Sequence, residues 1–150
     1  MTPEEFEQLL HAKSQEINAF LGGDILDIVG TEAVNHFKEN FEQEGFVDQT
    51  KQPWQEVKRR LNSRTRGVDR INKILHKTGE LKESISYEKQ PGSVIIYSDK
   101  PYASAHNEGT STAGRGRSTK IPKRQFIGQS QKLNEKIQKE IEEGLNRILK

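Results

Sequence analysis

The chain has 150 residues, a formal net charge of +2 and no cysteine, and 31% of its residues are hydrophobic. This length is typical of one domain, expected over residues 1–150, and the lack of cysteine excludes disulfides and thiolate metal sites. The low apolar content predicts a thin core, with some apolar surface buried against partner subunits.

Two helices are predicted at the N-terminus. The first begins at Thr2-Pro3-Glu4-Glu5, where a capping threonine is followed by proline and two acids. Apolar residues at helical spacing continue to Leu21, and Gly22-Gly23 predicts the end of this helix. Asp24 is then a candidate cap for a second helix that runs to about Glu44.

Residues 46–69 have no clear apolar period, which predicts a long connection. The single tryptophan of the chain, Trp54, lies within this connection. We expect this side chain to be buried and to anchor the connection on the helical layer.

The second half of the chain predicts a small antiparallel sheet. Residues 85–97 read as a hairpin that turns at Pro91-Gly92, and residues 122–127 as a third strand. A long amphipathic helix is expected from Gln129 to the end. The predicted fold class is therefore α+β, with this sheet flanked by two N-terminal helices and a long C-terminal helix. Residues 109–121, rich in Gly, Ser, Thr and Arg, predict a flexible basic loop.

The charges are unevenly distributed. Residues 1–50 hold 11 acids and 2 bases, whereas residues 51–77 hold 9 bases and 2 acids. Residues 111–124 hold five bases and no acid. This asymmetry is compatible with head-to-tail packing of identical subunits, with nucleic-acid contact by the basic stretches, or with solvated surfaces.

Catalytic and cofactor motifs are poorly supported. Gly109 and Gly114 have the spacing of a phosphate-binding loop, but Arg115-Gly116 replaces the required Lys and Ser/Thr. His106 and Glu108 are too few for a metal site, and no nucleophile has a recognisable base and orienting group. We therefore expect no enzyme activity, no metal, no cofactor and no small-molecule substrate.

Three short segments occur in a fixed order, namely Thr78–Ile85, Tyr102–Thr110 and Ile121–Gly128. Together they resemble the phage virion morphogenesis family, the tail completion proteins of contractile-tailed phages, and siphophage neck proteins have a looser version. The family commonly has a second proline where this chain has Gln125.

The resemblance implies a structural role for the matching residues, which are Gly79, Leu81, Tyr102, His106, Gly109, Pro122, Phe126 and Gly128. It also implies a structural assembly protein of a phage or prophage tail or neck, which completes the tail and helps head–tail joining. The expected partners are copies of the chain itself, in a ring, and other tail or neck proteins. Such a protein would be made in the bacterial host cytoplasm, as a virion component or assembly factor.

The acidic N-terminus does not resemble a signal peptide, and no apolar run approaches the roughly 20 residues of a membrane helix. We expect no membrane contact. The candidate contacts to a partner or to DNA are Arg115, Arg117, Lys120, Lys123 and Arg124. The alternative function is a small nucleic-acid-binding protein without sequence specificity, which would use stretches 51–77 and 111–124.

Overall fold

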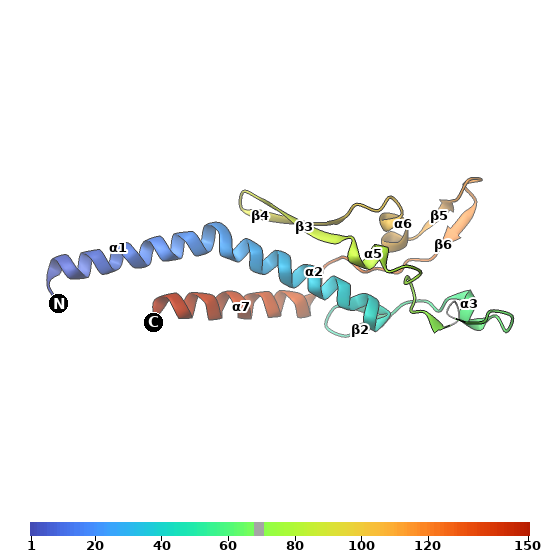
Figure 1. Ribbon diagram of the computed structural model, residues 1–150, viewed down its shortest axis with the longest axis horizontal. Helices are drawn as coiled ribbons and strands as arrows, with labels where there is room; N and C mark the ends of the chain where they lie inside the picture. Colours follow the sequence, from blue (N-terminus) through green and yellow to red (C-terminus); the bar gives the residue numbers. More distant parts are fainter. Residues whose placement is uncertain (68–70) are drawn as a thin grey trace.

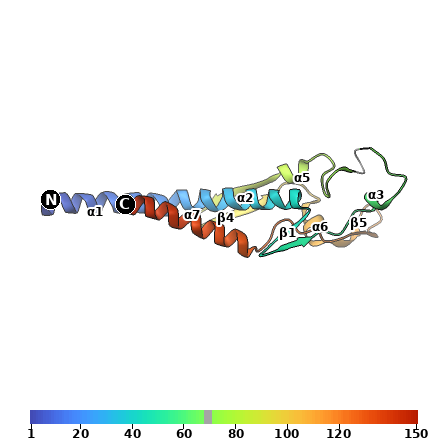
Figure 2. The same cartoon turned by 90° about the horizontal axis from the view of Figure 1, so that it is seen from below.

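The structure is a computed structural model that describes residues 1–67 and 71–150. The molecule is elongated, with a helical arm at one end and short helices and hairpins at the other (Figure 1). Both chain termini lie at the arm end, and the N-terminal helix extends past the C-terminus (Figures 1 and 2).

The arm begins with α1 (Pro3–Ala19), which continues through a π-helical turn η1 (Phe20–Asp24) into α2 (Ile25–Gln43). Thr2 caps α1: its hydroxyl accepts from the Glu5 backbone N–H, and the Glu5 carboxylate accepts from that of Thr2. The predicted stop at Gly22-Gly23 is wrong, and Asp24 makes no side-chain cap. The two glycines lie inside the π-helical turn, where the long helix bends (Figure 1).

The C-terminal helix α7 (Gln131–Leu149) confirms the amphipathic helix predicted for this segment, and it packs along α1 and α2. The Ser130 hydroxyl caps it by accepting from the Leu133 N–H. Near its other end Gly144 faces the Phe20 ring, and a Cβ at this glycine would lie 2.6 Å from the ring. This glycine therefore allows α7 to approach the π-helical turn η1 closely.

Within residues 1–67 and 71–150 the strands form three separate antiparallel pairs. The pairs are β1 (Gly45–Val47) with β2 (Lys51–Pro53), β3 (Ile85–Gln90) with β4 (Ser93–Ser98), and β5 (Thr110–Ala113) with β6 (Thr119–Ile121). The α+β class is confirmed, and so is the hairpin predicted at 85–97. The first pair lies in the connection predicted over 46–69.

The predicted strand at 122–127 is wrong. This segment is extended but joins no strand ladder in the described structure, and the backbone N–H groups of Phe126 and Ile127 both donate to Oδ1 of Asn107. A side chain thus takes the place of a neighbouring strand. The third pair forms instead at β5–β6, inside the segment expected to be a flexible loop.

In the described parts of the chain, these elements are linked by the short helices α3 (Lys58–Leu61), α5 (Glu80–Glu83) and α6 (Ala103–Glu108). Their positions at the end opposite the arm are visible in Figure 1.

The core lies where α2 meets the hairpins and the extended segment. Its buried residues are Ala33, Phe37, Phe41, Phe46, Trp54, Ile74, Leu81, Ile85, Ala103, Phe126 and Leu133. At the centre, the Phe41 ring lies between Trp54 and Phe126, with centroid distances of 5.4 and 5.1 Å. The Trp54 indole N–H donates to the Gln125 carbonyl at 2.7 Å, so the predicted anchoring role of this residue is confirmed.

The β3–β4 hairpin packs against α2. The Tyr87 ring lies directly over Gly30, where a Cβ would come within 2.3 Å of it, and its hydroxyl donates to Asp27 at 3.1 Å. The glycine in the middle of α2 is therefore required by the close approach of this ring.

Candidate interaction surfaces

The first of the three short segments forms a tight turn into α5. Gly79 has a φ of +80°, a left-handed conformation that favours glycine, and it immediately precedes the helix. The Glu80 N–H donates to the Thr78 hydroxyl at 3.4 Å, and Leu81 is buried in the core. The turn at Gly79 and the burial of Leu81 therefore fix the conformation of this segment.

The second and third segments are joined to each other through the backbone. The Arg124 N–H donates to the His106 carbonyl at 2.8 Å, at the end of α6. Gly109, with a φ of +77°, follows α6, and a Cβ there would lie 2.9 Å from the Lys123 backbone nitrogen. Family-like residues that are distant in sequence therefore form one continuous packed unit.

Arg124 was predicted to contact a partner or DNA, and its position in the structure corrects this. It is only 8% exposed, and its guanidinium donates to the carbonyls of Gln55 (3.0 Å) and Glu56 (3.4 Å). Arg124 ties the extended segment to the residues that precede α3. The neighbouring Lys123 is exposed.

The remaining family-like positions lie beside this segment. Pro122 is half-buried just after β6, whereas Tyr102, 40% exposed, immediately precedes α6. Gly128 leaves room for the Gln125 side chain, whose amide donates to the Ile127 carbonyl at 3.3 Å. The Gln125 side chain thus folds back on its own segment, which is not a strand.

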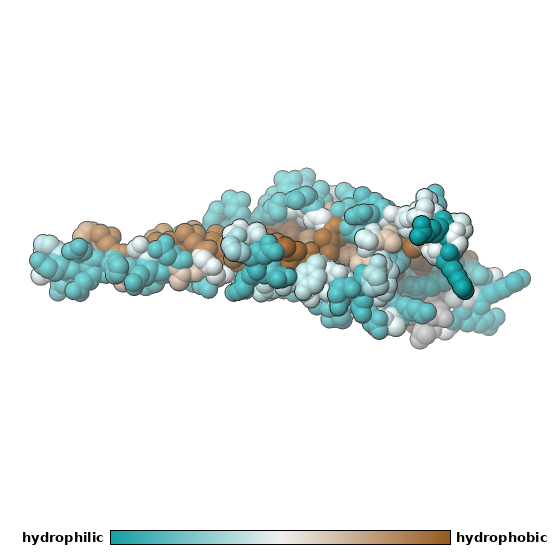
Figure 3. Space-filling view, turned by 90° about the horizontal axis from the view of Figure 1, so that it is seen from above, coloured by the Kyte–Doolittle hydropathy of each residue, from teal (hydrophilic) through white to brown (hydrophobic). Residues whose placement is uncertain are grey.

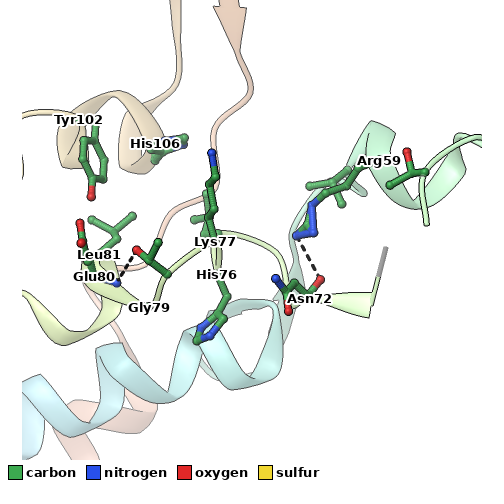
Figure 4. Close-up of a pocket in the computed structure, with 13 residues that line it drawn as sticks. Arg59, Asn72, His76, Lys77, Gly79, Glu80, Leu81, Tyr102 and His106 are labelled. Carbon is green, nitrogen blue, oxygen red and sulfur yellow. Dashed lines mark hydrogen bonds between the residues drawn. The ribbon is translucent and has the colours of Figure 1, made fainter. Parts of the chain in front are cut away.

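A cavity of about 910 Å³ opens among these elements (Figure 4). Its apolar lining comes from Val57, Leu75, Leu81 and Tyr102, and its polar lining includes Arg59, His76, Lys77 and His106. In Figure 4 Tyr102 lies above Leu81 and Glu80, and Lys77 lies between them and Arg59. The lining is thus partly apolar and mainly basic, with Glu80 as an acidic residue in it.

The β5–β6 hairpin presents Arg115, Arg117 and Lys120, all of them exposed. Arg115 and Arg117 lie in the turn between the strands, and Arg117 has a φ of +52°. None of the three forms an ion pair with any residue that the structure describes. Their charges are available to a partner.

The basic stretch 51–77 divides into paired and unpaired residues, and its positions 68–70 lie outside the described residues. Arg60 pairs with Glu44 at 2.8 Å, and Lys73 approaches Glu42 at 3.8 Å. Other basic residues are exposed and form no ion pair within the described parts of the chain: Lys58, Arg64, Arg66 and Lys77.

At the opposite end, the tip of α1 exposes apolar side chains. Phe6, Leu9 and Leu10 are 52%, 43% and 54% exposed. Lys13 donates to the Ile148 carbonyl near the end of α7, so these three residues lie beyond the support of that helix. Figure 3 shows apolar surface along this arm. The helical spacing identified these residues, but only the length of α7 shows that they are left uncovered.

His106 gives a prediction about pH. Its Nδ1 is buried with no hydrogen-bond partner among the described residues, and its pKa is lowered by burial and by the nearby positive charge of Arg124. Because the unfolded chain then binds the proton more readily, stability should fall as the pH drops below the ordinary value of 6.5. Chemical denaturation at about pH 8 and at about pH 5.5 measures this effect. Between these values His106→Gln should lose less free energy of unfolding than the wild type.

The control for this measurement is His11→Gln, because His11 is exposed on α1. This variant should keep the pH dependence of the wild type. An identical pH dependence for wild type and His106→Gln would contradict the role assigned to His106.

These surfaces and the packed segments define an α+β protein with exposed charged and apolar surfaces. A sequence profile of the phage virion morphogenesis family matches residues 6–146, so the chain belongs to that family and has a phage structural or assembly role. No curated protein and no solved structure matches it significantly. No helix in the described parts of the chain is long and apolar enough to cross a membrane.

Proposed function

We propose that this protein completes the tail of a phage or prophage and makes it competent to join the head. It acts without bond chemistry, by associating with copies of itself, in a ring, and with other tail or neck proteins. The observation that carries the proposal is the family match over residues 6–146, which includes all three short segments. The exposed apolar arm and the unpaired basic hairpin supply surfaces that such contacts need.

A phage that lacks the gene tests this proposal. Electron microscopy of its lysate should show filled heads and separate tails, and the wild-type gene supplied in trans should restore joined, infectious particles. Normal joined particles without the gene would overturn the proposal.

The basic hairpin is tested by the double variant Arg115→Ala/Arg117→Ala. It should fold normally but lower the yield of infectious particles, because the two exposed arginines no longer contact a partner. The matched control is Lys132→Ala/Lys139→Ala, which removes two exposed positive charges from α7. Equal yields for the two variants would exclude a specific assembly role for the hairpin.

The alternative, contact with DNA backbone, has a different signature. Binding of random-sequence duplex by the purified protein would weaken steeply with salt, in proportion to the phosphates neutralised. If Arg115→Ala/Arg117→Ala reduced such binding as well as infectivity, the hairpin would be assigned to DNA. If no binding occurred at low salt, its partner would be a protein.

A further inference from the structure

The two ends of the molecule differ in charge. The arm tip carries Glu4, Glu5 and Glu7, and the first Lys or Arg in the sequence is Lys13. Glu5 accepts from the Thr2 N–H within the helix cap, whereas Glu4 and Glu7 form no ion pair with a described residue. The tip therefore combines unpaired negative charge with the exposed apolar residues Phe6, Leu9 and Leu10.

The far end has the complementary properties. Residues 51–67 and 71–77 together hold eight basic residues and one acid. Leu61 and Ile71 are each 75% exposed in this stretch. The 910 Å³ cavity has Val57, Leu75 and Tyr102 among its apolar walls. The far end thus offers apolar contact surface surrounded by positive charge.

These two surfaces lie at opposite ends of the long axis, so they cannot meet within one chain (Figures 1 and 2). We propose that the arm tip of one copy binds the basic end of a second copy, with Phe6, Leu9 and Leu10 on the apolar lining of the cavity. This inference rests on the proposed self-association and names the contact that produces it.

Such a contact is heterologous, because it joins two different patches. Each added copy leaves one free tip and one free basic end, so association continues until a ring closes or a filament forms. The bend at η1 turns the arm relative to the rest of the chain, which provides curvature between successive copies (Figure 1). Burial of the apolar side chains supplies stability, and the opposite charges direct the approach.

A symmetric dimer of two arms is less favourable. Pairing the apolar faces of two α1 helices would bring two negatively charged helices together, because α1 holds more acidic than basic residues. It would also leave Leu61 and Ile71 uncovered. Charge complementarity therefore selects the basic end of another copy as the occupant.

The test uses sedimentation velocity with the full chain and two charge-reversed variants. Glu4→Lys/Glu7→Lys reverses the arm tip, and Arg64→Glu/Lys77→Glu reverses part of the basic end; all four side chains are exposed. Each variant alone should associate about tenfold more weakly than the wild type. An equal mixture should recover association, because the unchanged tip of one variant then meets the unchanged basic end of the other, and the reversed tip residues meet the reversed residues of the basic end.

A control variant reverses charges elsewhere: Lys132→Glu/Lys139→Glu on α7 should associate like the wild type. Wild-type association should also weaken between about 50 mM and about 500 mM salt. A second test is Phe6→Ser/Leu10→Ser, which removes apolar contact at the tip and should weaken association at every salt concentration. Circular dichroism would establish that each variant remains folded.

Three outcomes would overturn this contact. In the first, the wild-type chain stays monomeric at about 100 μM. In the second, the charge-reversed variants associate as strongly as the wild type. In the third, the mixture of the two variants shows no recovery of association. The experiment on the phage gene is independent of these results. A monomeric protein that still completes tails would remove this contact and leave the proposed tail function standing.

Discussion

Replacing Phe126 by alanine should lower the free energy of unfolding by about 3–5 kcal/mol, the usual cost of deleting a fully buried aromatic ring. The Phe126 side chain is 1% exposed and lies against Phe41, whose other neighbour is Trp54. These residues come from an extended segment, α2 and the connection after β2. Because they hold three separate parts of the chain together, little relaxation is available to fill the space left by the ring.

Urea denaturation measures this effect, and Phe6→Ala is the matched control. Phe6 is 52% exposed on the arm, so the same substitution there should change the stability of the monomer by about 0.5 kcal/mol or less. The comparison should use dilute protein, where association of the arm contributes nothing. Similar losses for the two variants would show that Phe126 is not the centre of the core.

The long helices could be predicted because their apolar spacing depends on local geometry. The residues that bury α2 and α7 recur every three or four positions, and the threonine and serine caps lie where the helices start. The error at Gly22-Gly23 has a physical reason. Glycine disfavours a helix by only about 1 kcal/mol, and packing of Phe20 against Gly144 on α7 favours continuation.

The small sheets were harder to predict, because tertiary contacts determine which segments pair as strands. The β3–β4 hairpin has a turn signal and β-branched residues, and these features predicted it correctly. Residues 122–127 have similar apolar content, but side chains of Asn107 and Asn40 satisfy backbone groups that a neighbouring strand would otherwise satisfy. A polar side chain that replaces a strand leaves no periodic signal in the sequence.

The candidate surfaces were predicted in part. The sequence identified the basic residues but could not separate Arg124, held by two backbone carbonyls, from the exposed Arg115 and Arg117. Charge counts contain no information about burial. The cavity was not predicted, because Val57, Leu75 and Tyr102 come from three separate parts of the chain.

Asn40→Ala should destabilise the protein by about 2–6 kcal/mol, since two backbone groups lose their partner at about 1–3 kcal/mol each. Asn40 is fully buried on α2; its amide donates to the Phe126 carbonyl at 3.0 Å, and its Oδ1 accepts from the Val47 N–H at 3.1 Å. One side chain thus joins the helix to β1 and to the extended segment. Asn35→Ala, at an exposed position on the same helix, should cost about 0.5 kcal/mol or less.

Asn40→Asp separates this hydrogen-bonding role from simple loss of volume. The aspartate keeps the size and one acceptor, but when ionised it places negative charge against the Phe126 carbonyl in a buried site. Burial should raise its pKa above the unfolded value of about 3.9, so the folded state would retain a proton that the unfolded chain loses. The stability of this variant should therefore fall, relative to the wild type, as the pH rises from about 4 to about 7. A constant difference over this range, or a loss for Asn40→Ala no greater than for Asn35→Ala, would contradict the role assigned to Asn40.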